Sequence, residues 1–201
     1  MNRRHNSGIT SAHLPARRVV VHAVFALLAL VVGALAYADF LFGAKLALFG
    51  NLGSDSLNIY YPYLVLISRA LSEGVLPVWS FSVGMGQNIS AQLDELLFSP
   101  VVWLPEGWLS GALAWQHLGK SVLVGLLFHG FLRLRGCPPV SAMIGGLLLG
   151  YSGYMAIGAC WLFHADELLC LSALLWSVEL ALSRGRWCAL PLAVAAWAAV
   201  S

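Results

Sequence analysis

Charged residues are scarce in this chain. Of its 201 residues, 11 are Lys or Arg and 9 are Asp or Glu, about 10% in all, whereas 60% are apolar. Soluble domains average about 25% charged and 45–50% apolar residues. With a mean hydropathy of +0.81, this composition excludes a soluble domain, and it excludes intrinsic disorder, which requires low hydrophobicity. A net charge of only +2, without a basic face, predicts no nucleic acid among the partners.

The sequence motifs of nucleotide-dependent and hydrolytic enzymes are absent as well. The chain has no phosphate-binding loop, dinucleotide fingerprint, GxSxG elbow or HExxH motif. Its four cysteines lack CxxC spacing, which predicts small apolar side chains rather than disulfides or a zinc site. We therefore expect no cofactor and no metal.

Long apolar runs are present instead, and they are typical of helices that cross a membrane. Residues 19–38 give 20 residues, about 30 Å of helix, which matches one bilayer core. Further spans are predicted at 109–132, 140–158 and about 163–183, and the run 187–201 offers about 22 Å, too short to cross. The prediction is an all-α, polytopic transmembrane bundle that forms the N-terminal part of a longer protein. Continuous rather than alternating apolar runs argue against a β-barrel.

The first apolar run admits a second interpretation. Ala36-Tyr37-Ala38 has the small-x-small form of a signal-peptide cleavage site. The run is longer than the ~7–15 residues usual for a signal peptide, which favours an uncleaved helix. The topology of the following residues is the same in both cases.

The distribution of charge predicts an orientation. If the helices alternate in direction, eight of the 11 basic residues fall on one side, within 1–18, 133–135 and 184–186. Eight of the nine acidic residues fall on the other side, and Glu179 is the exception. The positive-inside rule then predicts a multi-pass protein of the cell membrane, with residues 1–18 in the cytoplasm and 39–108 outside.

The long segment 39–108 contains no full span and carries two basic residues against six acidic ones. Ser54-Asp55-Ser56 is typical of a helix start, and the apolar-rich stretch to Glu73 with one polar face predicts a helix lying in the membrane interface. Asp55 has two interpretations: it caps this helix, or it acts as a general base on a hydroxyl at the membrane surface. The acidic pair Asp94-Glu95 is either simply solvated or ligates a metal.

Lys120 is the basic residue that most needs an explanation, because it lies near the middle of the predicted span 109–132. A lysine at that depth costs at least ~2.5–3.5 kcal/mol, so we expect it to face the bundle and to pair with a phosphate or a carboxylate. Gln116, His117 and Ser121 share its helix face at i, i+4 spacing.

Two further patterns lie in the third and fourth spans. His164, Asp166 and Glu167 gather at the external end of the fourth span, where they form either a plain helix cap or a polar or metal-binding site with the segment 39–108. Gly146 and Gly150 have a small-xxx-small spacing that permits close packing of helices.

Several short motifs in a fixed order resemble one known family. They are Ser54-Asp55-Ser56-Leu57-Asn58-Ile59-Tyr60-Tyr61-Pro62-Tyr63, then Arg69, Gly74, Pro77-Val78-Trp79-Ser80, Gly84-Met85-Gly86-Gln87-Asn88, Ser99-Pro100, Lys120 and Leu149-Gly150-Tyr151-Ser152-Gly153-Tyr154. In order and spacing they resemble the YfhO-like bacterial membrane proteins, whose architecture is similar to that of the C-type glycosyltransferases. The resemblance covers residues 19 to 186.

The resemblance implies a membrane glycosyltransferase that uses a sugar carried on a polyprenyl phosphate and acts on a cell-envelope glycan at the external face. Asp55 matches the catalytic base, and Lys120 and Arg69 match the groups that hold the donor phosphate. The substrate-binding residues expected beside them are Tyr60, Tyr61, Gln116, His117, His164 and Asp166. The expected partners are membrane lipid, the lipid-linked sugar and the glycan acceptor. The alternative is a non-catalytic transporter or flippase subunit, for which Lys120 would line a substrate path.

Overall fold

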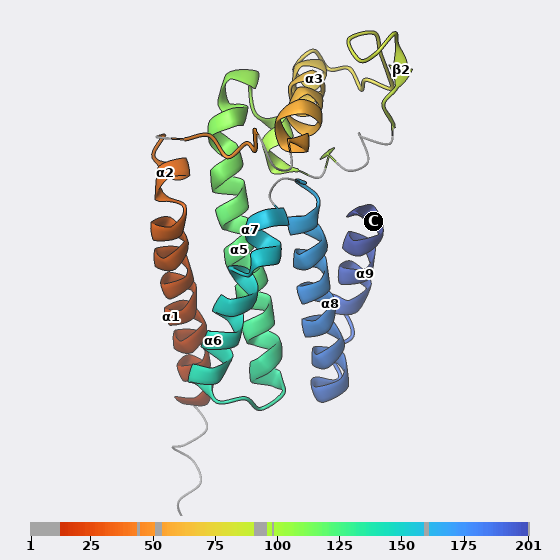
Figure 1. Cartoon of the computed structure of the whole chain (residues 1–201). Coiled ribbons are helices and arrows are strands. Elements are labelled where there is room, and N and C mark those ends of the chain that lie inside the picture. The colour runs from red at the N-terminus through yellow and green to blue at the C-terminus, as the bar shows by residue number, and fades with distance from the viewer. Residues whose placement is uncertain are drawn as a thin grey trace, which may run out of the picture.

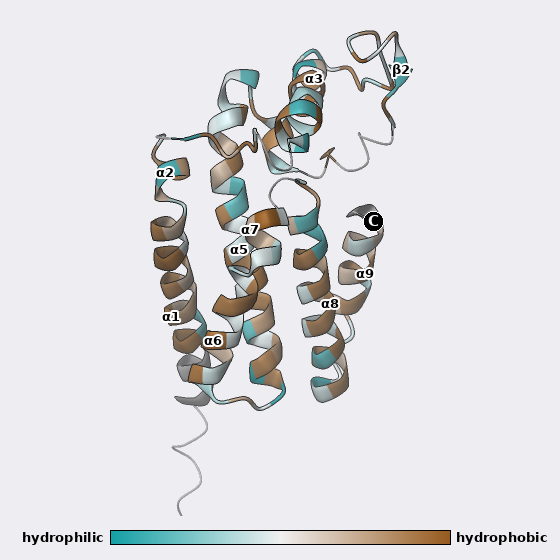
Figure 2. Cartoon of the chain, in the orientation of Figure 1, coloured by the Kyte–Doolittle hydropathy of each residue, from teal (hydrophilic) through white to brown (hydrophobic). Residues whose placement is uncertain are grey.

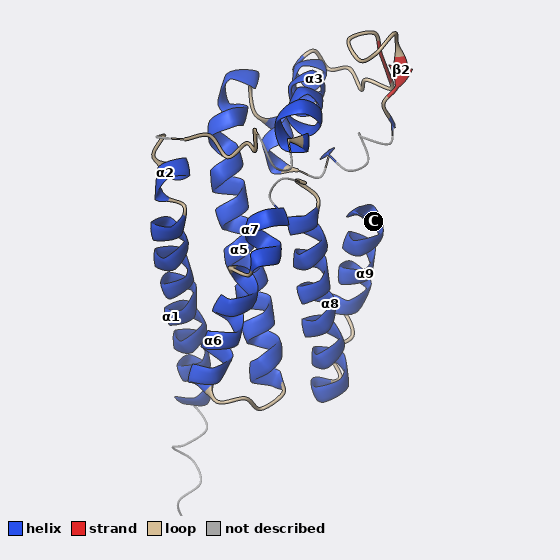
Figure 3. Ribbon diagram, in the orientation of Figure 1, coloured by secondary structure: helices blue, strands red, loops and turns tan. Residues whose placement is uncertain are grey.

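The computed structural model describes residues 13–43, 45–50, 54–90, 96–97, 99–158 and 161–200. These residues are mostly helical, which confirms the all-α prediction (Figure 3). The longer helices form a bundle (Figure 1), and they are α1 (His13–Ala36), α5 (Leu109–Leu134), α6 (Pro139–Gly150), α8 (His164–Arg184) and α9 (Ala189–Val200).

The helices alternate in direction along the bundle (Figure 1). One end, which we call the loop end, carries the described parts of the segment 39–108 together with the start of α8. The opposite end, which we call the arginine end, carries Arg133, Arg135 and Arg184. This alternation is the arrangement on which the charge-based orientation depends. Glu179, the acid on the unexpected side, faces Arg135 at 3.5 Å.

Two stretches of the described chain are long and apolar enough to cross a membrane, Val19–Ala36 in α1 and Pro139–Gly158 in α6 and α7 (Gly153–Gly158). Only 17% and 22% of these stretches are buried inside the protein, whereas the core helix of a soluble protein is mostly buried. Figure 2 shows hydrophobic residues dominating α1 and α6, with hydrophilic residues in α3 and at the loop end of α5 and α8. The helices α5 and α8 are about 39 and 31 Å long at the usual rise, and their role as spans stays a prediction.

The third predicted span, 140–158, is not one continuous helix. In the structure it consists of two helices. The helix α6 ends at Gly150, and α7 begins at Gly153 after a turn. The Ser152 hydroxyl accepts a hydrogen bond from the Met155 N–H, as an N-terminal cap does. Beside it, the Tyr151 hydroxyl donates to the Ala29 carbonyl of α1 at 2.6 Å. The turn therefore has local capping and an anchor on a neighbouring helix.

Close packing of α6 on α5 confirms the expectation for the two spaced glycines. A Cβ on Gly146 would lie 2.8 Å from the Gly125 carbonyl oxygen, and a Cβ on Gly150 would lie 2.6 Å from the Ser121 carbonyl oxygen. Only the absence of a side chain permits these backbones to approach so closely. The adjoining core is apolar and includes the fully buried Phe25.

The segment at the loop end consists of short elements. They are α2 (Ala38–Leu41), the π-helix η1 (Ser56–Tyr60), α3 (Tyr61–Ser72), the antiparallel strand pair β1 (Trp79–Ser80) and β2 (Gln87–Asn88), and the 3-10 helices η2 (Pro100–Trp103) and η3 (Glu106–Trp108). The helix α3 is amphipathic as predicted: Leu64 and Ile67 are fully buried, while Arg69 and Ser72 are exposed. The Ser68 hydroxyl, on the buried side, donates to the Leu104 carbonyl at 2.6 Å.

Candidate functional site

Asp55 lies where the helix formed by η1 and α3 begins, but its carboxylate does not cap that helix. Instead, Asp55 Oδ2 accepts a hydrogen bond of 2.8 Å from the indole Nε1 of Trp161, which is 106 residues away in the sequence. The capping interpretation of Asp55 is therefore wrong. The carboxylate is partly buried, and no described basic side chain forms an ion pair with it.

The backbone around Asp55 is fixed by its neighbours. The Ser56 side chain is fully buried, and its hydroxyl accepts a hydrogen bond of 2.7 Å from the Phe49 N–H. Pro62 follows η1 and lies in the first turn of α3. Because proline has no N–H and its ring crowds the preceding turn, a wider π-turn before it relieves a clash within the helix. Residues close to Asp55 in the sequence thus fix the position of its backbone.

Trp161 is the functional candidate that the sequence analysis missed. It lies in the turn between α7 and α8, where its backbone N–H donates to the Gly158 carbonyl. Its ring packs edge-on against His164 with centroids 5.2 Å apart, and His164 in turn contacts Phe163 at 4.4 Å. Tyr60 of η1 contacts Phe163 at 5.9 Å. The start of α8 and η1 therefore meet through aromatic side chains, whereas the interpretation of His164 predicted a polar or metal-binding contact with the segment 39–108.

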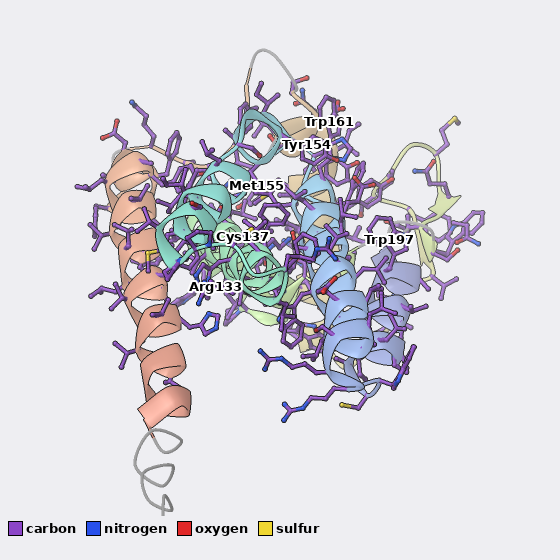
Figure 4. All side chains as sticks on the ribbon, turned by 90° about the horizontal axis from the view of Figure 1, so that it is seen from below. Arg133, Cys137, Tyr154, Met155, Trp161 and Trp197 are labelled. Atoms are coloured by element: carbon purple, nitrogen blue, oxygen red, sulfur yellow. The ribbon has the colours of Figure 1, made fainter. Side chains whose placement is uncertain are left out.

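Glu167 organises the polar side of this cluster. Its Oε2 accepts a hydrogen bond from the Tyr154 hydroxyl at 2.9 Å and lies 2.9 Å from Nδ1 of His164. Figure 4 shows Tyr154 and Trp161 close together where α7 and α8 meet. Their rings and that of His164 line a cavity of about 330 Å³, together with Gly153, Ile157 and Gly158. We call this space the α7–α8 cavity.

Lys120 has a protein partner, Asp166. Its Nζ lies 2.6 Å from Asp166 Oδ2, and the two side chains are 8% and 23% exposed. A carboxylate was one of the two partners expected for this lysine. The pair connects α5 to the first turn of α8. A phosphate that binds Lys120 would therefore have to replace Asp166.

Arg69 and Gln116 are also engaged by other parts of the protein. The Arg69 guanidinium binds the Glu106 carboxylate through Nε and Nη2, at distances from 2.9 to 3.2 Å. Gln116 Oε1 accepts hydrogen bonds from the Ser99 hydroxyl and the Val101 N–H, which attaches η2 to α5. Tyr61 packs against the apolar cluster under α3. These three residues are not brought to Asp55.

His117 lies apart from this cluster, on the side of α5 that faces α1. Its ring packs edge-on against Tyr37 at 5.2 Å, and its Nε2 atom has no hydrogen-bond partner among the described residues. Both side chains line a second cavity of about 390 Å³ that is otherwise apolar. The shared polar face predicted for residues 116–121 therefore divides among three different neighbours.

Within the described residues, no group of three or more His, Cys, Asp or Glu side chains is placed to hold a metal ion. Cys137, Cys170 and Cys188 are free thiols. Asp94, Glu95 and Cys160 lie outside the described residues.

The chain was compared with protein-family models, curated proteins and solved structures, and none of them matches it.

Proposed function

We propose that this chain is a membrane glycosyltransferase, or part of one, that transfers a sugar from a polyprenyl-phosphate donor to a cell-envelope glycan. The observation that carries the proposal is the Asp55 carboxylate, which is held at 2.8 Å by Trp161 and forms neither a helix cap nor an ion pair with a described residue. A carboxylate with one oriented oxygen and no neutralising cation suits a general base.

In the proposed reaction Asp55 removes the proton from an acceptor hydroxyl. The hydroxyl oxygen attacks the anomeric carbon of the donor sugar, and the bond from that carbon to the phosphate oxygen breaks. The polyprenyl phosphate leaves with the bonding electron pair, and Asp55 keeps the proton. The reaction needs no metal and no nucleotide in the site, but it needs positive charge near the leaving phosphate.

Lys120 supports this part of the proposal better than Arg69 does. Fourteen residues of continuous helix separate Asp55 from Arg69, roughly 20 Å, which is too far for both to contact one sugar phosphate. Lys120 contacts Asp166, five residues after Trp161. We propose that the donor phosphate exchanges with Asp166 for the Lys120 ammonium group.

The experiment compares Asp55→Asn with Asp39→Asn in membranes of cells that lack the native protein. Asp39 also lies at the loop end, where it pairs with the exposed Lys45. We expect Asp55→Asn to lower sugar transfer by ~10²–10⁴-fold at unchanged protein level, since an amide cannot accept the proton. Asp39→Asn should retain transfer. Normal envelope glycans with Asp55→Asn would refute the proposed function.

The second candidate is a transporter or flippase subunit, and the buried Lys120–Asp166 pair favours it, because ionisable pairs between spans often mark substrate paths. Asp55→Asn separates the candidates, with Asp39→Asn as the control. A transporter that moves a lipid-linked sugar requires Lys120 and Asp166 but tolerates Asp55→Asn.

The proposed transferase requires the loop end to lie outside the cell. With one cysteine per variant, an impermeant thiol reagent added to intact cells should label positions 45 and 90 but not 135 and 185. Labelling at 135 would reverse the proposed orientation.

A further inference from the structure

The α7–α8 cavity has aromatic walls and lies beside an excess of negative charge. Trp161 joins it to the proposed base, because this residue lines the cavity and its Nε1 donates to Asp55 Oδ2. The cavity volume of about 330 Å³ is at the lower end of the ~300–1,000 Å³ typical of small-molecule sites. A single ring-shaped ligand would fit such a space.

The aromatic rings suggest what kind of ring that is. Tyr154, Trp161 and His164 all line the cavity, and the ring centroids of Tyr154 and Trp161 lie 5.5 and 5.2 Å from that of His164. The C–H faces of a sugar are apolar and pack flat against aromatic rings, while the hydroxyls at its edge need polar partners. Glu167 does not itself line the cavity, but its carboxylate contacts the Tyr154 hydroxyl and Nδ1 of His164, so a polar group lies directly behind two of these rings.

The charges determine which sugars are compatible. The Asp166 carboxylate is neutralised by Lys120, and Glu167 is shared between His164 and Tyr154. The Asp55 carboxylate accepts a hydrogen bond from the neutral Trp161 indole and forms no ion pair with any described basic side chain. A ligand carboxylate placed here would be repelled, and the low dielectric of a partly buried site strengthens that repulsion.

We infer that the α7–α8 cavity is a subsite for a sugar ring without negative charge, and that Asp55 and Glu167 together exclude uronic acids. This inference deepens the proposed function, on which it rests, by naming the substrate class. It also assigns Trp161 two tasks, because the same indole orients the base and forms a wall of the subsite.

The test measures binding rather than turnover. The full chain is reconstituted in lipid nanodiscs, and saturation-transfer NMR reports the binding of two matched pairs of probes: methyl glucoside with methyl glucuronide, and methyl galactoside with methyl galacturonide. We expect at least one neutral sugar to bind. The matching uronate should bind with an affinity at least roughly tenfold lower. Glu167→Gln should reduce this discrimination, while Glu106→Gln, a charge change at the exposed Arg69 pair, should leave it intact.

Three outcomes would overturn the inference: no sugar binds, uronates bind as well as neutral sugars, or a decyl chain displaces the sugar. The last outcome would identify the cavity as a site for lipid chains. To test location, Trp161→Leu should abolish sugar binding, whereas Trp103→Leu, at an exposed position of η2, should not. If a neutral sugar binds as expected while Asp55→Asn still transfers sugar, the subsite is supported and the enzyme proposal fails. If Asp55→Asn abolishes transfer but no sugar binds to the cavity, the enzyme proposal is supported and the subsite is refuted.

Discussion

The two halves of α5 are attached to the rest of the bundle in different ways. Toward the loop end, α5 binds its neighbours through polar side chains, namely Gln116 to η2 and Lys120 to α8. Toward the arginine end, the backbone itself makes the contact, because Gly125 lies against α6 without an intervening side chain. The polar half is next to the proposed site, and the close-packed half supports it from a distance.

This difference predicts how each half responds to mutation. A buried charge that loses its partner has no water to replace it, whereas a close backbone contact fails only when added atoms force the helices apart. The polar half should therefore show strong coupling between pairs of residues. In the close-packed half, the glycines at the helix contact should act without a matching partner.

The largest effect is expected for Asp166→Leu, which leaves Lys120 buried without a counter-ion. We expect a loss of about 3–5 kcal/mol in unfolding free energy, measured by denaturant unfolding in detergent micelles. Lys120→Met should cost less, because the Asp166 side chain is 23% exposed and can still reach water. The double variant should recover much of the stability; additive losses would show that the ion pair does not hold α5 and α8 together.

The next effect is expected in the close-packed half. Gly150→Ala places a Cβ 2.6 Å from the Ser121 carbonyl oxygen, so α6 has to move away from α5, at a cost of about 1–3 kcal/mol. Gly119→Ala is the matched control, because a Cβ there meets nothing within 4 Å. In the same unfolding assay this control should be neutral or stabilising. Equal losses for both would mean that the close contact with the Ser121 carbonyl is not the cause of the loss, because Ala is the better helix former at either position.

A smaller effect is expected where the close-packed half contains its own polar pair. His22 of α1 and His129 of α5 approach through their Nδ1 atoms at 3.1 Å, and His129 is fully buried against Phe25. His22→Leu leaves this nitrogen unpaired and should cost about 1–2 kcal/mol. Adding His129→Phe removes the unpaired group and should restore stability. If the double variant has a lower unfolding free energy than His22→Leu alone, the cost comes from lost packing rather than from the lost hydrogen bond.

The sequence predicted the close-packed half better than the polar half. Apolar runs define the helices, and the Gly146–Gly150 spacing predicted a close helix contact without naming α5 as the partner, because both patterns are local. The break between α6 and α7 was missed, since Tyr151 and Ser152 interrupt an apolar run without adding charge. The partner of Lys120 stayed open between a phosphate and a carboxylate, because it depends on how α5 and α8 align.

The candidate site shows the same limit. Asp55 was identified from its place at a helix start, but its contact with Trp161 joins residues 106 positions apart, and no spacing rule predicts such a pair. One local signal was present: Trp161 and Phe163 lie three and one positions before His164, so an aromatic cluster beside this histidine was visible in the sequence. Tertiary packing then determined which aromatic ring reached the carboxylate.

The smallest effect is expected for the polar pair outside the bundle, Arg69 with Glu106. Its geometry is bidentate, yet the side chains are 62% and 47% exposed, so water screens the attraction and solvates either partner alone. Arg69→Gln should therefore cost no more than about 0.2–1 kcal/mol, and added salt should reduce the difference from the native chain. Because Arg69 lies roughly 20 Å along the helix from Asp55, we also expect the variant to keep its apparent KM for the lipid-linked sugar, unlike Lys120→Met. A raised KM with Arg69→Gln at unchanged stability would place the donor phosphate at α3, and the polar half of α5 would then be structural rather than part of the site.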